Sequence, residues 1–335
     1  MPDGNNIRRR TFLQTTVAAS AGLSAATNAS AESVEAPDNK KEVPYGMIGD
    51  VKVSRLILGA NVMSEWAHSR DLRYVRQLMR RYNTEERLFN VLKTAEAMGI
   101  NHMLQGSAKL LKDYNTKFDG HMHHIRHLPV NQEDTEQTIK KKADALIQSG
   151  VRMSYVYGCS SDLLVRDGRV DIIGKALEIA KTAGIVCGIG GHSLKVVKDC
   201  EKEGLRPAYY LKTFHHDQYW SATPKENRKD FCWYAPGSDI ADSGVRPEHN
   251  EFHDNMWCLE PEETIEVMSK VKVPWIAYKV LAAGAISPTS GFKYALQNGA
   301  DFMAVGMLDY QIEEDVAILN GLYARGVKRD RPMMG

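Results

Sequence analysis

Short apolar runs alternate with amphipathic stretches of helical period along most of this chain, and this alternation constrains the fold most strongly. The helical stretches include residues 85–98, 135–149, 172–183, 194–202, 261–270 and 291–297. The apolar runs lie at residues 53–58, 100–104, 121–128, 151–157, 185–189, 208–214, 275–281 and 302–306. Strands that alternate with crossover helices build a parallel sheet. Eight such strands predict an α/β fold, a single (β/α)8 TIM barrel, with an open doubly wound sheet as the alternative.

The first residues have the pattern of a leader peptide. Arg9 and Arg10 precede Phe12 and Leu13, and a mildly apolar stretch rich in Ala, Ser and Thr leads to small residues at 29–31. This pattern resembles a twin-arginine export signal, whereas a disordered basic tail is the alternative. We therefore expect a signal peptide over 1–31, a polar linker over 32–45, the barrel over 46–328, and a periplasmic or secreted protein.

The charge balance and the cysteines narrow the possible partners. Lys and Arg number 43 against 42 Asp and Glu, and a net charge of +1 gives no footprint for nucleic acid. After the leader, no stretch approaches the ~20 apolar residues that a membrane span needs. The five cysteines occur singly, without the spacing of a structural zinc site. We expect a small-molecule substrate and neither nucleic acid nor a membrane span.

Two connections are longer than a barrel requires. They follow the first and sixth predicted strands, at 61–84 and 215–260. Connections from strand to helix lie on the face where barrel enzymes keep their active sites. Long loops are functional lids or disordered segments. The second loop carries Trp220, Trp233, Tyr234 and Trp257, which suit stacking on a sugar ring, so we predict a lid over 215–260.

Histidines and acids near strand ends suggest catalytic or metal-binding chemistry. His215, His216 and Asp217 end the sixth predicted strand, and His253 lies in the predicted lid. A histidine beside a carboxylate can ligate a divalent metal or act as a general base. His123 belongs to a histidine cluster at the third strand that could also ligate metal or bind sugar hydroxyls. The alternatives are a solvated loop start and a polar lid without a ligand.

Lys279 lies among apolar residues of the seventh predicted strand. A lysine there must reach the barrel mouth, pair with an acid or shift its pKa. It is therefore a candidate to stabilise a substrate oxyanion or to act as a base. The alternative is a structural ion pair with an acid such as Asp309.

Gly190, Gly191 and His192 follow one another at the end of the fifth predicted strand. Backbone amides at such a position can form an anion-binding nest at a helix start. Capping of the following helix by Ser193 is the alternative role of this turn.

Several segments are similar to those of the aldo-keto reductases. They are VSRLILG (53–59), AEAMGIN (95–101), GIGGHS (188–193), IAYKVLAAGA (276–285), and the eighth strand with its following helix, which contains Gly306. The resemblance implies a barrel that reduces carbonyls with NADPH through a Tyr acid tuned by Lys, Asp and His. Where the family has Asp, strand two ends in Gln105, and where it has His, strand four ends in Tyr157. Ordinary hydride transfer is therefore not expected, although NAD(P) phosphate could still bind near Gly306.

These features together predict an exported barrel enzyme that acts on a carbohydrate or similar polyol. It would use metal-assisted or His/Lys acid–base chemistry, as a lyase, isomerase or epimerase does. The first alternative is an NAD(P)H-dependent reductase with a rearranged tetrad. The second is a sugar-binding barrel without catalytic activity.

Overall fold

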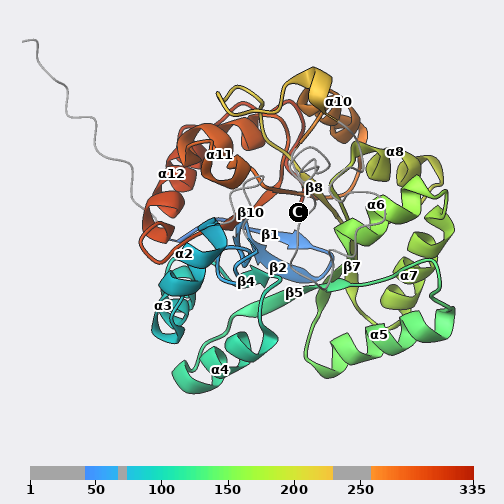
Figure 1. Ribbon diagram of the computed structural model, residues 1–335, viewed down its shortest axis with the longest axis horizontal. Helices are drawn as coiled ribbons and strands as arrows, with labels where there is room; N and C mark the ends of the chain where they lie inside the picture. The colour runs from blue at the N-terminus through green and yellow to red at the C-terminus, as the bar shows by residue number, and fades with distance from the viewer. Residues whose placement is uncertain (1–41, 67–73, 229–257) are drawn as a thin grey trace, which may run out of the picture. The chain divides into compact units, whose positions relative to one another are not determined.

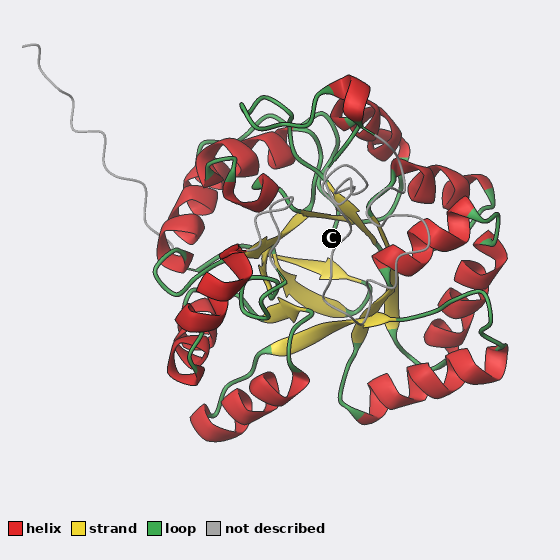
Figure 2. Ribbon diagram, in the orientation of Figure 1, coloured by secondary structure: helices red, strands yellow, loops and turns green. Residues whose placement is uncertain are grey.

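The structure, a computed structural model, describes residues 42–66, 74–228 and 258–335, which belong to one compact unit. Its strands form a closed barrel of eight parallel strands and a separate antiparallel pair. Figures 1 and 2 show helices packed around the outside of the barrel strands. The predicted (β/α)8 barrel is confirmed. The predicted signal peptide and most of the predicted lid lie outside the described residues.

The barrel strands follow chain order around the barrel, and the last strand closes against the first. Each predicted apolar run overlaps a barrel strand, and most observed strands are shorter than predicted. The barrel strands are β3 (Leu56–Gly59), β4 (His102–Leu104), β5 (His123–Leu128), β6 (Met153–Val156), β7 (Val186–Gly191), β8 (Tyr210–Thr213), β9 (Trp275–Tyr278) and β10 (Phe302–Gly306).

Helices follow the strands, and each of the six predicted helices overlaps an observed one. The helices are α2 (Tyr74–Tyr82), α3 (Glu85–Ala97), α4 (Ala108–Phe118), α5 (Glu136–Gln148), α6 (Gly158–Arg166), α7 (Val170–Thr182), α8 (Leu194–Lys202), α10 (Pro261–Lys270), α11 (Pro288–Gln297) and α12 (Ile312–Ala324), with 3-10 turns η1 (Lys225–Asn227) and η2 (Ala282–Gly284). The sequence did not predict α2 and α6, and their burial gives the reason. α6 buries most of its length and so shows no clear apolar stripe, whereas α2 is amphipathic but buries no residue.

The seventh barrel strand, β9, ends at Tyr278 rather than at 281 as predicted. Lys279 has a φ of 60°, and Ala282 and Ala283 also have positive φ values. Left-handed residues turn the chain out of the extended conformation, so the apolar run continues as a turn. Lys279 therefore lies just beyond the strand, at its carboxyl end.

The amino-terminal end of the barrel is closed by a hairpin of β1 (Tyr45–Ile48) and β2 (Val51–Ser54). Ile48 and Val53 of this hairpin pack in one cluster with side chains of the barrel interior. The predicted linker extended to residue 45, but Val43 is already buried and its amide bonds to the Met98 carbonyl. The barrel unit also continues past 328, because Arg331 is buried against β10 and its neighbours.

Candidate active site

A buried histidine–aspartate pair lies at the carboxyl ends of the barrel strands, the region that we call the mouth. Asp162 stands in α6, which follows β6, and His192 directly follows β7. The Oδ2 atom of Asp162 lies 2.6 Å from Nδ1 of His192, and the side chains are 0% and 7% exposed, respectively. A carboxylate can only accept a hydrogen bond, so Nδ1 carries a proton. In the neutral tautomer that this bond selects, the lone pair lies on Nε2, the position that a general base uses.

The same carboxylate accepts two backbone hydrogen bonds from the turn before α8. The amides of His192 and Ser193 each lie 3.0 Å from Oδ1 of Asp162. An anion nest was predicted at Gly190, Gly191 and His192; of these, the His192 amide binds a carboxylate that the chain itself supplies. The Ser193 hydroxyl caps α8 by accepting the Lys195 amide, as the alternative for this turn predicted.

Two residues fix the position of the His192 ring. A Cβ on Gly158 would lie 3.3 Å from Cε1 of His192, so glycine allows the ring to approach the start of α6 closely. Tyr278, the last residue of β9, meets the ring edge to face at 5.6 Å between centroids. Burial raises the pKa of Tyr278 well above its usual value, and nearby Asp162 adds to the effect. Tyr278 therefore keeps its proton at neutral pH, and its hydroxyl donates to the Gly191 carbonyl at 3.5 Å.

A second polar cluster lines the mouth at barrel strands two to four. Gln105 accepts a hydrogen bond from Nδ1 of His127 at 2.6 Å and donates one to the Tyr155 hydroxyl. Tyr157 stacks obliquely on His127, with ring centroids 4.7 Å apart. These strand ends are where the aldo-keto reductases place catalytic residues. Here they present an amide, an imidazole and phenols.

Lys279 and Cys159 lie close to each other beside the histidine–aspartate pair. Burial and the Asp162 charge raise the pKa of the Cys159 thiol to about 12, although the Lys279 charge opposes the shift. The thiol is therefore protonated and is no nucleophile at neutral pH. The Lys279 charge also contributes to lowering the pKa of His215. Lys279 thus lies at the mouth, as its position after β9 predicts.

His215 is buried, and both of its ring nitrogens are engaged. Its Nδ1 donates to the His216 carbonyl at 2.8 Å, and its Nε2 accepts the Cys258 amide at 2.9 Å. Burial lowers its pKa to about 4, so the ring is neutral at pH 7. A nitrogen that accepts an amide hydrogen has no lone pair to give to a metal.

The other predicted ligands point to different places. His216 hydrogen-bonds to Ser290 of α11 at 3.0 Å, and Asp217 pairs with Arg228 at 2.9 Å. Arg228 also donates to the Leu259 carbonyl, so this pair joins the two described ends of the predicted lid. His123 begins β5, at the opposite end of the barrel from the mouth.

The structure does not bring the predicted metal ligands together. Within the described residues, no group of three or more His, Cys, Asp or Glu side chains could hold a metal ion. His253, Trp233, Tyr234 and Trp257 lie outside those residues, so a metal site that depends on His253 stays a prediction.

The glycines predicted to bind a cofactor have close neighbours in the protein. A Cβ on Gly306 would lie 2.6 Å from Cγ2 of Val62, and one on Gly191 would lie 2.9 Å from Cβ of Val196. A Cβ on Gly190 would lie 2.8 Å from the ring of Tyr155. Close packing alone therefore accounts for glycine at these three positions.

Sequence reasoning missed Asp162, Tyr278 and Gln105 as site residues, and it considered His127 only as part of the histidine cluster at the third strand. Asp162 lies in a helix that was not predicted, 30 residues from its partner histidine. The available signal was its place shortly after a strand, because residues after parallel strands converge at one face of a barrel.

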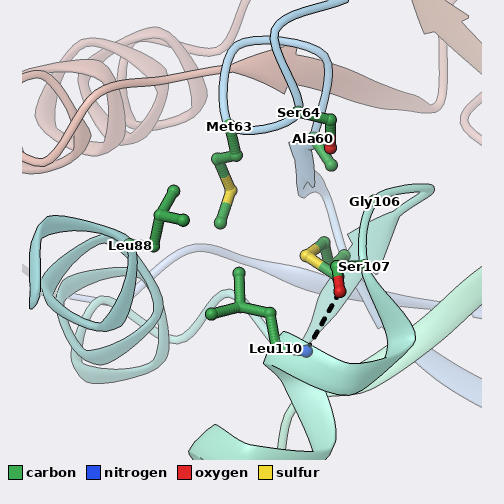
Figure 3. Close-up of a pocket in the computed structure, with 8 residues that line it drawn as sticks. Ala60, Met63, Ser64, Leu88, Gly106, Ser107 and Leu110 are labelled. Carbon is green, nitrogen blue, oxygen red and sulfur yellow. Dashed lines mark hydrogen bonds between the residues drawn. The ribbon is translucent and has the colours of Figure 1, made fainter. Parts of the chain in front are cut away.

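A small apolar pocket of about 260 Å³ lies beside the loops after β3 and β4. Figure 3 shows its lining of Ala60, Met63, Ser64, Leu88, Met103, Gly106, Ser107 and Leu110. The Ser107 hydroxyl is already engaged by the Leu110 amide. Because the lining holds no titratable side chain, the histidine–aspartate pair is the better candidate for catalysis.

Comparison with known proteins supports the fold. No protein-family model matches the sequence, and no curated protein is significantly similar to it. A solved structure described as "Putative aldo-keto reductase" from Pseudomonas aeruginosa superposes with a TM-score of 0.53 at 15% identity, over 84% of this chain and 94% of that one. A second structure of that description and organism gives 0.51 at 14% identity, over 85% and 96%. Similarity at this level shows a shared barrel fold.

Proposed function

We propose that this chain is a barrel enzyme that acts by proton transfer at the mouth, with His192 as general base and Asp162 as the residue that orients it. The observation that carries the proposal is the buried Asp162–His192 hydrogen bond at the carboxyl ends of the strands. Active sites of barrel enzymes lie at this face. A buried carboxylate holds the imidazole in one tautomer and stabilises the cation that forms when it takes a proton.

The neighbouring groups suit a carbohydrate or similar polyol. Nε2 of His192 would remove a proton next to a substrate carbonyl. Return of the proton to carbon completes an isomerase or epimerase step, whereas in a lyase step the bond to a β leaving group breaks and the proton goes to that group. The Lys279 ammonium and the Tyr278 hydroxyl would stabilise the developing oxyanion. Tyr157 and His127 offer aromatic faces and hydrogen bonds to sugar hydroxyls.

A second candidate function is reduction of a carbonyl with NAD(P)H. The observation that favours it is the presence of Tyr278, Lys279, His192 and Asp162 at one mouth, since these are the residue types of the aldo-keto reductase tetrad. In this chain they come from different strands than in that family, so the tetrad would be a rearranged one. The barrel's similarity to two proteins described as aldo-keto reductases is consistent with this candidate.

We further propose that the protein works outside the cytoplasm, because its leader resembles a twin-arginine signal. Replacing Arg9 and Arg10 by Lys should retain the precursor inside the cell, and normal secretion of this variant would contradict the proposal. No helix among the described residues is long and apolar enough to cross a membrane. A divalent metal stays a prediction that elemental analysis of the purified protein can test.

The proposed function is tested by solvent exchange. The purified protein is incubated with a panel of aldoses, ketoses and uronic acids in D2O, and deuterium at carbon is followed by NMR. We expect exchange with at least one substrate, reduced about 100-fold or more in His192→Gln and unchanged in His121→Gln, an exposed histidine outside the mouth. NADPH oxidation with the same panel would favour the second candidate. A folded protein with neither activity would contradict both.

A further inference from the structure

A large polar groove lies on the outer side of the barrel, between α4 and α5. Its volume is about 1220 Å³, which is ample for a small-molecule ligand. It runs over β5 toward the amino-terminal end of the barrel, where Asn101 and His102 belong to its lining. Figure 1 shows α4 and α5 on either side of this strand. The groove is therefore a different site from the mouth, which lies at the other ends of the strands.

Positive charge is concentrated in this groove. Its charged lining residues are Asp50, Lys52, Lys109, Lys112, Arg126 and Arg152. Only one of them is acidic, although the whole chain has a net charge of +1. The excess of positive charge is thus a local property of the groove and does not reflect a basic protein.

Three of these cations lack an acidic partner among the described residues. Arg152 pairs with Asp50, and Lys109 pairs with Asp113. Lys52, Lys112 and Arg126 form no ion pair with any residue that the structure describes. The Lys52 ammonium lies over the Tyr45 ring at 4.2 Å from its centroid, a contact that leaves its charge without a counter-ion. The three positive charges can therefore act on a ligand that enters the groove.

Arg126 contributes to the groove lining from β5. Ile125 packs inside the barrel, so alternation along β5 directs Arg126 outward. The guanidinium is half-buried and makes no hydrogen bond within the described part of the chain. Its five N–H donors form a planar fork that matches the oxygens of phosphate or sulfate.

The histidine that lies beside Arg126 on β5 brings no negative charge to offset the guanidinium. His124 lies on the same side of β5, and burial lowers its pKa to about 4, with a smaller contribution from the Arg126 charge. It is neutral at pH 7, and it hydrogen-bonds to the Gln105 carbonyl at 2.7 Å. Arg126 therefore faces no carboxylate and no second charge on its own strand.

We infer that the groove between α4 and α5 binds a small molecule that carries phosphate or sulfate groups. Arg126 binds the oxyanion from β5, and Lys112 on α4 and Lys52 on β2 supply further charge. Phosphate and sulfate share the tetrahedral oxygens that a guanidinium recognises.

Calorimetric titration at low salt tests this inference, with inorganic pyrophosphate as the first probe. We expect a dissociation constant below about 1 mM. Arg126→Gln should weaken binding at least about tenfold, equivalent to about 1.4 kcal/mol. Lys112→Gln, on the exposed face of α4, should weaken it about threefold without risk to the fold. Lys181→Gln removes the same charge from α7, outside the groove, and should leave binding unchanged.

Glucose 6-phosphate and glucose 6-sulfate as further probes distinguish the two sources of the oxyanion, and tighter binding of either one supports the inference. Absence of saturable binding up to about 10 mM pyrophosphate would overturn it. Equal weakening by Lys181→Gln would overturn it too. Tighter binding of a single-stranded oligonucleotide than of any small probe would replace the small molecule with a nucleic acid and contradict the inference.

Discussion

Each end of the barrel contains a fully buried aspartate, and the two differ in their partners. At the mouth, Asp162 bonds to the His192 ring and to two backbone amides. At the opposite end, Asp301 pairs with Arg329 and Arg331 at 3.0 and 2.9 Å. The arginines are permanently charged, whereas a histidine can gain and lose a proton near neutral pH. Although both aspartates are equally buried, Asp301 therefore stabilises the structure, whereas the partner of Asp162 suits it to proton transfer.

The Asp301 network holds the chain together at the closed end of the barrel. Its carboxylate also accepts the amides of Trp275 and Met334, and Arg55 bonds to its carbonyl. These contacts join β9, β10 and the segment after α12. None of these groups lies at the mouth, so substitutions here should affect stability and leave chemistry unchanged.

The largest expected effect on stability is that of Asp301→Asn. This change leaves the buried Arg331 and the partly buried Arg329 without their shared anion, and breaking a buried charge pair costs about 3–5 kcal/mol. Urea unfolding should show this loss, while the activity per folded molecule is unchanged. Asp171→Asn, which removes an exposed pair with Arg169, is the control and should change stability by less than about 1 kcal/mol. A loss at Asp301 no larger than that of the control would contradict the structural role.

A smaller loss is expected for Asp217→Asn. Asp217 pairs with Arg228, with side chains 18% and 11% exposed, and a hydrogen bond between charged groups contributes about 1.5–3 kcal/mol. The free energy of unfolding should fall by that order, and solvent exchange should continue in the folded variant. If the variant instead lost a bound divalent metal and its activity at unchanged stability, the predicted metal site would be restored.

The smallest effect, counted per pH unit, concerns the pH dependence of stability at the closed end. Burial, with a contribution from His123, lowers the pKa of His102 from 6.5 to about 3. Between these values the unfolded chain binds a proton that the folded chain does not, so stability is lost as pH falls below about 6.5. His102→Gln should remove this dependence. The slope that is lost corresponds to the binding of up to one proton, or about 1.4 kcal/mol of unfolding free energy per pH unit. Urea unfolding from pH 7 to 4 measures it, and an unchanged slope would contradict the buried neutral ring.

Sequence reasoning located the barrel well and the site less well, for a physical reason. Strand and helix periods are local, so each barrel strand could be predicted from its own residues. The Asp162–His192 pair arises only because β6 and β7 are neighbours in the barrel. His215, His216 and Asp217 are adjacent in sequence, yet each has a separate local partner. Adjacency of polar residues therefore predicted a cluster that separate local hydrogen bonds keep apart.

The most direct test of the different roles of the two aspartates is a paired measurement of exchange rate and unfolding free energy in Asp162→Asn and Asp301→Asn. We expect Asp162→Asn to lower the rate about 100-fold or more, because the amide no longer stabilises the imidazolium. Its free energy of unfolding should fall by only about 1–3 kcal/mol, since one oxygen still accepts the backbone amides. Asp301→Asn should show the reverse pattern. Full exchange activity in folded Asp162→Asn would contradict a catalytic His192–Asp162 pair.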